Sequence, residues 1–393
     1  MNVPRARRFT ATLMAAALLA SCGDDDPVAD TSPTGERQTT DVASTGTTST
    51  ESPGTGSPGT EPPGTEPVDG QTITLVTYDS FPESDTPVNE ALGAFSEEMG
   101  IDVELLLAGD TGTMVSKAAL TAGNPEGDVM WGVDNTFLSR AVDEGVFEPY
   151  TAEGLDAVDT ELLALVPGGE ATPVDYGDVC VNYDIAWFDD AGLAPPETLE
   201  DLTDGRYADL LVVENPATSS PGMAFLLATI ARFGEDEWPD YWRALRDNGV
   251  EVVDGWNQAY YERFTWAGGP KPLVVSYGSS PPAEVIFADP PRDDAPTGVV
   301  TDTCFRQVEY AGVLAGTEHP DEARLLVDFL LSAEFQDTLA LNLFVYPANE
   351  DVELPPEFVE FAAVPDDPAA VDPEDVAANR SDWVDTWTEV TLR

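Results

Sequence analysis

The sequence predicts an α/β fold of two lobes, a clamshell in which two strands cross the hinge between the lobes. Short apolar segments rich in β-branched residues alternate with amphipathic segments over about 320 residues, which is typical of parallel sheets covered by helices. This alternation occurs twice along the chain, and a late apolar segment is placed to return to the first group of strands. The length also suits two lobes of ordinary size.

The first group of elements begins with a strand over 72–78, where threonine, isoleucine and valine favour an extended backbone. A helix is predicted over 87–99 because Val88, Leu92 and Phe95 share one face and a glycine follows. The same reasoning predicts the rest of this group: strands over 101–107 and 128–133, and helices over 112–122 and 135–144.

The second group of elements has the same composition of apolar strands and amphipathic helices. Its predicted strands are 177–183, 210–213, 250–253 and 272–277, and its helices are 222–233 and 257–265. A strand over 303–314 would return to the first lobe, and helices over 320–331, 333–341 and 374–388 end the chain. We therefore expect lobe 1 over 71–176 and 304–393, and lobe 2 over 177–303.

The N-terminus indicates export and lipid anchoring. A basic start is followed by a short apolar run over 11–20 and by Leu19-Ala20-Ser21-Cys22. This order is typical of a secretory signal over 1–22, and it resembles the bacterial lipobox, in which the cysteine is lipidated. Residues 23–70 are rich in Thr, Ser, Pro and Gly, and Pro-Gly-Thr recurs in them, so we expect a disordered tether. The folded part would then be held at the outer face of the cell membrane.

Charge and cysteine content limit the possible functions. The chain has 74 acidic and 17 basic residues, a formal net charge of −57, which excludes nucleic acid as a natural partner. Cys180 and Cys304 remain once Cys22 is lipidated, and in an oxidising compartment a disulfide between them is the first expectation, two buried thiols the alternative. We expect no metal site, because His319 is the single histidine and precedes a proline in a surface-like turn.

No catalytic motif is present, so a binding protein is expected rather than an enzyme. The chain has no Gly-x-Ser-x-Gly elbow, phosphate-binding loop or zinc-ligand spacing. Aromatic and small polar residues instead follow the predicted strands, where ligands bind in open α/β sheets. These segments are Tyr78–Phe81, Gly109–Gly112, Asp134–Asn135, Thr218–Gly222, Asp254–Asn257 and Ser276–Ser280.

From Tyr78 to about Arg393 the sequence resembles bacterial thiamine-binding proteins of ABC importers. The matching segments occur in the same order: Thr77-Tyr78-Asp79-Ser80-Phe81, Asp134-Asn135, Asp175-Tyr176-Gly177, Thr218-Ser219-Ser220-Pro221-Gly222, Gly255-Trp256-Asn257-Gln258-Ala259-Tyr260, Ser276-Tyr277-Gly278-Ser279-Ser280-Pro281 and Tyr346-Pro347. The resemblance implies a periplasmic-binding-protein-like fold of type II. It also implies capture of thiamine or its phosphates by a monomer without a cofactor, and delivery to an ABC permease in the membrane.

The resemblance also implies roles for individual residues. Tyr78 and Trp256 would supply aromatic faces for the pyrimidine and thiazolium rings, and a cationic ring gains cation–π attraction there. Asp110 would lie near the positive charge, with Asp134 in the same site. Ser219, Ser220, Gly222 and Tyr277 would hold the hydroxyethyl or phosphate end. Phe344 takes the place of a tryptophan common in the family, and Ala283 that of a tyrosine.

Two other kinds of ligand and one other class of protein are also considered from the sequence. Tyr260 and Tyr261 are adjacent, and paired tyrosinates suit ferric iron. An organic cation such as a polyamine would suit the acidic chain. A secreted hydrolase would need a nucleophile beside a base, and His319 is poorly placed for that role.

Overall fold

The computed structural model describes residues 70–393, except for residues 165, 167 and 291. The expected signal over 1–22, with Cys22, lies outside the described residues, as does the expected tether up to residue 69. Among the helices that the structure describes, none combines the length and the apolar character needed to cross a membrane.

One mixed sheet organises the described part, with the strand order β2-β1-β3-β9-β5-β8-β6-β7. The pairs toward both ends of this order are parallel: β1 pairs with β2 and β3, and β6 pairs with β7 and β8. The bounds are Gln71–Thr77 for β1, Ile101–Leu107 for β2, Val129–Asp134 for β3, Leu211–Glu214 for β6, Glu251–Val253 for β7 and Leu273–Tyr277 for β8. The two α/β groups expected from the alternating pattern are therefore present.

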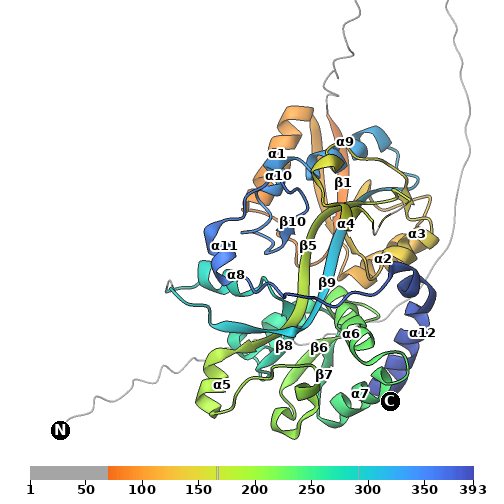
Figure 1. Ribbon diagram of the computed structural model, residues 1–393. Helices are drawn as coiled ribbons and strands as arrows, with labels where there is room; N and C mark the ends of the chain where they lie inside the picture. Colours follow the sequence, from red (N-terminus) through yellow and green to blue (C-terminus); the bar gives the residue numbers. More distant parts are fainter. Residues whose placement is uncertain (1–69, 165, 167, 291) are drawn as a thin grey trace, which may run out of the picture. The chain divides into compact units, whose positions relative to one another are not determined.

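Two long antiparallel strands join the groups, as Figure 1 shows: β5 (Thr172–Asp184) and β9 (Thr297–Leu314). β9 continues into pairing with β3, and β5 into pairing with β8. This arrangement confirms the clamshell with two crossing strands. Both strands are longer than predicted, because polar residues such as Asp175 interrupt the apolar pattern, whereas the interstrand hydrogen bonds continue past them.

A disulfide links Cys180 of β5 to Cys304 of β9, with Sγ atoms 1.97 Å apart. The two cysteines lie 124 residues apart in the sequence and in the middle of the crossing strands. The bond therefore joins the two strands where they run between the groups.

The helices differ from the predicted ones in three respects: the type of one helix, the end of another, and the presence of helices that were not predicted. The predicted helix over 257–265 is a π-helix over Gln258–Arg263, and the helix predicted over 333–341 ends at Gln336. Five helices in the described part of the chain were not predicted: α4, α5, α7, α8 and α11. The helix bounds are α1 Pro87–Met99, α2 Thr111–Leu120, α3 Leu138–Asp143, α4 Thr160–Leu163, α5 Ile185–Ala191, α6 Ser220–Phe233, α7 Trp238–Asp247, α8 Pro281–Ile286, α9 Pro320–Leu330, α10 Ala333–Gln336, α11 Pro356–Phe361 and α12 Pro373–Leu392.

The C-terminal helix α12 contacts both groups of elements, and Figure 1 shows it beside α7. Trp387 of α12 packs edge-to-face on Trp242 of α7, with ring centroids 5.5 Å apart. Arg380 of the same helix donates hydrogen bonds to the carbonyl oxygens of Thr136 and Pro216, which belong to different groups. These contacts hold the carboxyl ends of strands from the two groups near each other.

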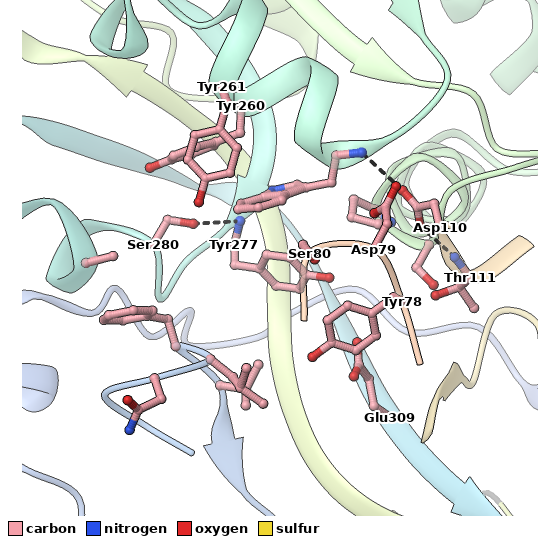
Figure 2. Close-up of a pocket in the computed structure, with 18 of the residues that line it drawn as sticks. Tyr78, Asp79, Ser80, Asp110, Thr111, Tyr260, Tyr261, Tyr277, Ser280 and Glu309 are labelled. Atoms are coloured by element: carbon pink, nitrogen blue, oxygen red, sulfur yellow. Dashed lines mark hydrogen bonds between the residues drawn. The ribbon is translucent and has the colours of Figure 1, made fainter. Parts of the chain in front are cut away.

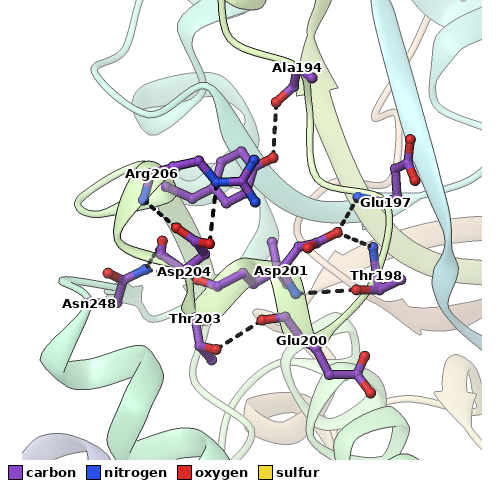
Figure 3. A network of polar contacts seen from close by, with 11 residues as sticks. Ala194, Glu197, Thr198, Glu200, Asp201, Thr203, Asp204, Arg206 and Asn248 are labelled. Atoms are coloured by element: carbon purple, nitrogen blue, oxygen red, sulfur yellow. Dashed lines mark hydrogen bonds and ion pairs between the residues drawn. The ribbon is translucent and has the colours of Figure 1, made fainter.

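Many of the acidic side chains cap turns rather than bind partners. In the segment before β6 (Figure 3), the Asp201 carboxylate accepts hydrogen bonds from the N–H groups of Glu197 and Thr198, at 3.0 and 3.2 Å. The Asp204 carboxylate accepts one from the N–H of Arg206. Backbone hydrogen bonds therefore hold the pKa of Asp201 below its ordinary value. Such local roles explain part of the acidic composition without a ligand.

Candidate ligand-binding site

A cavity of about 210 Å³ lies at the carboxyl ends of strands from both groups. Tyr78 follows β1 and Asp110 follows β2, whereas Trp256 follows β7 and Tyr277 ends β8. Figure 2 shows Tyr78, Asp110 and Tyr277 around one space, with Glu309 of β9 beside Tyr78. This is where ligands bind in open α/β sheets.

Aromatic side chains form much of the wall. The Trp256 indole stacks on the Tyr260 ring, with centroids 5.0 Å apart and planes 17° apart. Its Nε1–H donates a hydrogen bond of 2.9 Å to Ser276 Oγ, which fixes the orientation of the indole. Tyr277 lies 6.5 Å from the same indole. The π faces of these rings offer favourable positions for a flat or cationic ligand.

Four carboxyl groups line the cavity, from Asp79, Asp110, Glu284 and Glu309. No lysine, arginine or histidine is among the described residues that line it. Burial raises the pKa of the Asp110 carboxyl to about 6, although N–H groups of Trp256 and Thr111 donate hydrogen bonds to it. The cavity therefore carries negative charge at neutral pH and favours a cation.

Two hydrogen bonds cross the cavity and join the segments that follow β1 and β2 to the segment that follows β7. The Trp256 N–H donates to Asp110 Oδ2 at 3.1 Å, and Asn257 Nδ2 donates to Asp79 Oδ1 at 3.2 Å. A Cβ atom on Gly255 would lie 2.8 Å from Asp110 Oδ2, so glycine permits this close approach. These bonds link the two sides of the cavity in this conformation.

Six of the nine residues proposed from sequence line the cavity: Tyr78, Asp110, Ser220, Trp256, Tyr277 and Phe344. Asp134, Ser219 and Gly222 do not. The Asp134 carboxylate accepts hydrogen bonds from the N–H and hydroxyl of Thr136 and so shapes the turn after β3. Ser219 is fully buried as the N-cap residue of α6. Gly222 lets α6 pack on β6, because its Cβ would lie 2.5 Å from the Glu214 carbonyl oxygen.

Other lining residues were not singled out from sequence. Glu309 lies within a strand, whereas the candidate residues were chosen because they follow strands, so that criterion could not find it. The available signal was a charged residue between Val308 and Tyr310, the single charged residue of the run 308–314. Phe287, which follows α8, lies one helical turn beyond Ala283 and packs edge-to-face on Phe344, with centroids 5.8 Å apart.

The family model described as "Bacterial extracellular solute-binding protein" matches residues 125–366, well over half of the chain. The chain belongs to this family. This solute-binding protein is 28% identical over 325 residues to the thiamine-binding periplasmic protein of Escherichia coli K12, covering 82% of this chain and 94% of that protein. It is 27% identical over 326 residues to the thiamine-binding periplasmic protein of Brucella suis, covering 82% and 92% of the two chains.

Among solved structures, a periplasmic thiamin binding protein matches with a TM-score of 0.72 and 27% identity, over 82% of this chain and 97% of that one. A ferric binding protein from Campylobacter jejuni matches with a TM-score of 0.65 and 17% identity, over 81% and 99% of the two chains. The latter likeness concerns the fold alone. These matches confirm the type II fold and the resemblance to the thiamine-binding family, and they place this solute-binding protein outside the cytoplasm.

Proposed function

We propose that this solute-binding protein captures thiamine and delivers it to an ABC permease. The observation that carries the proposal is the cavity itself, with aromatic walls, four carboxyl groups and no basic side chain among its described lining residues. A thiazolium ring is flat and permanently cationic, so it gains from both features. The thiamine-binding proteins of E. coli and Brucella suis, similar to this chain over most of their length, support the same ligand.

In this proposal the thiazolium lies against the aromatic wall near Trp256, within reach of the Asp110 carboxylate. Tyr78 contacts the pyrimidine ring from the other side of the cavity. The hydroxyethyl group, or a phosphate, points toward the first turn of α6, where Ser219, Ser220 and Gly222 lie. The first turn of a helix leaves backbone N–H groups without intrahelical partners, and these bind oxygen atoms well.

The proposal includes an anchored monomer that closes around its ligand. Lipidation at Cys22 and a tether over 23–70 would keep the protein near the permease. The lobes would comprise residues 71–176 with 304–393, and residues 177–303, which suits the long strands β5 and β9 between them. Ligand binding would favour the closed arrangement, since ligand contacts come from both lobes.

An organic cation is favoured over ferric iron by the contacts of the two adjacent tyrosines. The Tyr260 hydroxyl donates a hydrogen bond of 2.8 Å to Glu284 Oε1, and its ring stacks on Trp256. The Tyr261 ring stands at 84° to that of Tyr260.

Isothermal titration calorimetry of the purified full chain tests the proposal. Thiamine, its mono- and diphosphate, spermidine and ferric citrate would be titrated in parallel. We expect thiamine to bind with micromolar or tighter affinity and spermidine far more weakly. Absence of thiamine binding, or a tyrosinate-to-iron absorption band with ferric citrate, would contradict the proposal.

A further inference from the structure

Two acidic side chains face each other across the crossing strands beneath the cavity. Asp175 of β5 is the direct partner of Glu309 of β9 in the antiparallel register. Both are buried, with exposed fractions of 1% and 7%. Glu309 lines the cavity, where Figure 2 shows it beside Tyr78.

The pair has too few hydrogen-bond partners for its two carboxyl groups. Gln307 Nε2 donates to Glu309 Oε1 at 3.0 Å, and Trp131 Nε1 donates to Asp175 Oδ2 at 2.9 Å. The second oxygen of each carboxyl group is buried and has no hydrogen-bond partner. The charged groups that act on Glu309 are Asp175, Asp134 and Asp110, all acidic. Burial and these neighbours raise the pKa of Glu309 well above its ordinary value.

This arrangement destabilises the ligand-free fold. Like charges directly opposite on antiparallel strands repel each other, and a buried polar atom without a partner carries a desolvation penalty. Side chains that lower stability in this way are typical of functional positions, where a ligand supplies what the fold lacks. An N–H group of a ligand would give the Glu309 carboxyl its missing partner.

We propose that Glu309, supported by Asp175, binds the amino group of the ligand's pyrimidine ring and selects amine donors at the base of the cavity. This inference rests on the proposed function and adds a residue that determines specificity for a hydrogen-bond donor on the ligand. In its ionised form, which a bound cation favours, the Glu309 carboxylate accepts hydrogen bonds only. It then favours an N–H group and disfavours a carbonyl oxygen in the same position. A site built for a donor rejects an analogue that lacks it, because buried polar groups are then left unpaired.

The test compares thiamine with oxythiamine, in which an oxo group replaces the pyrimidine amino group. Calorimetry of the wild-type chain should show a preference for thiamine of about tenfold or more. In Glu309→Gln the side-chain amide can donate to the oxo group, so this preference should fall at least about fivefold. Asp175→Asn, which acts on the ligand only through Glu309, should reduce the preference by a smaller factor.

Glu214→Gln is the matched control. Glu214 is also buried, and both of its carboxyl oxygens lack partners, but it does not line the cavity. Both Glu→Gln variants should raise the thermal unfolding midpoint of the ligand-free protein, and only Glu309→Gln should change the ligand preference. An unchanged preference in Glu309→Gln, with thiamine still bound, would overturn this inference and leave the proposed function standing. Wild-type protein that binds neither ligand would overturn both.

Discussion

Trp256 is the residue whose contacts best separate ligand binding from folding. Its indole is partly buried, held by Tyr260 and Ser276, and it presents a face to the cavity. Trp256→Ala should weaken thiamine binding by about tenfold or more, because cation–π attraction at a desolvated site is worth about 1–2 kcal/mol. Calorimetry measures this change, and Trp266→Ala is the control, because Trp266 packs on the same cluster without lining the cavity. Equal losses of affinity in the two variants would remove Trp256 from the site.

Asp110 should make binding and stability depend on pH in opposite directions. Its folded-state pKa of about 6 lies above the ordinary value of 3.8, so its contribution to stability is fully present below about pH 4. That contribution is lost as the pH rises through 6. Ionisation, however, supplies the negative charge that attracts a cationic ligand.

We therefore expect thiamine affinity to fall as the pH is lowered from 8 to about 5. Over the same change, the contribution of Asp110 to the stability of the ligand-free protein should rise. Calorimetry and thermal unfolding at several pH values measure the two effects. Asp110→Asn should flatten both profiles relative to the wild type. Profiles that keep their slopes in Asp110→Asn would assign the pH dependence to other groups.

At the scale of elements, Gly222 determines how α6 approaches β6 at the edge of the cavity. Gly222→Ala would place Cβ 2.5 Å from the Glu214 carbonyl oxygen, so the helix must shift. We expect a loss of about 1–3 kcal/mol in the free energy of unfolding, measured with urea, together with weaker thiamine binding. Gly93→Ala is the control, because no atom lies within 4 Å of its Cβ position and alanine favours a helix. A neutral Gly222→Ala variant would show that α6 has room to move.

The crossing strands provide a second prediction at this scale. The Cys180–Cys304 disulfide closes a long loop, and its removal increases the conformational freedom of the unfolded chain. The Cys180→Ser/Cys304→Ser double variant should lose about 2–5 kcal/mol in the free energy of unfolding. Reduction of the wild-type protein should have a similar effect on its urea unfolding curve. Equal stability of the oxidised protein and the double variant would contradict this expectation.

For the whole molecule, the dominant feature is the excess of 74 acidic over 17 basic residues. Self-repulsion at this charge density destabilises the compact state, and salt screens it over about 10 Å at 0.1 M. The thermal unfolding midpoint should therefore rise by several degrees between low and molar salt, with NaCl and KCl acting alike. Dependence on one particular cation at millimolar concentration would indicate a specific site instead.

The sequence by itself determined the class of fold, because hydrophobic periodicity is local. The bounds of α1 and β2 follow directly from apolar spacing and from Gly100, which ends the helix in a left-handed conformation. The same pattern located the segments after β1, β2 and β7, which supply Tyr78, Asp110 and Trp256, and the end of β8, which supplies Tyr277. By contrast, α7 was not predicted. A proline near its start and its charged residues interrupt the apolar pattern, although the helix has an apolar face that packs on α12.

Only the tertiary structure decided which polar side chains meet. The register of β5 against β9 pairs Asp175 with Glu309, a contact between residues more than a hundred positions apart that no local pattern encodes. The same packing left Asp134 and Gly222 out of the cavity lining and put Phe287 beside Phe344 in its wall. The tendency to form a strand can be recognised from residues close together in the sequence, whereas strand register and the packing of the lobes depend on the whole chain. The chemistry of the site follows from register and packing.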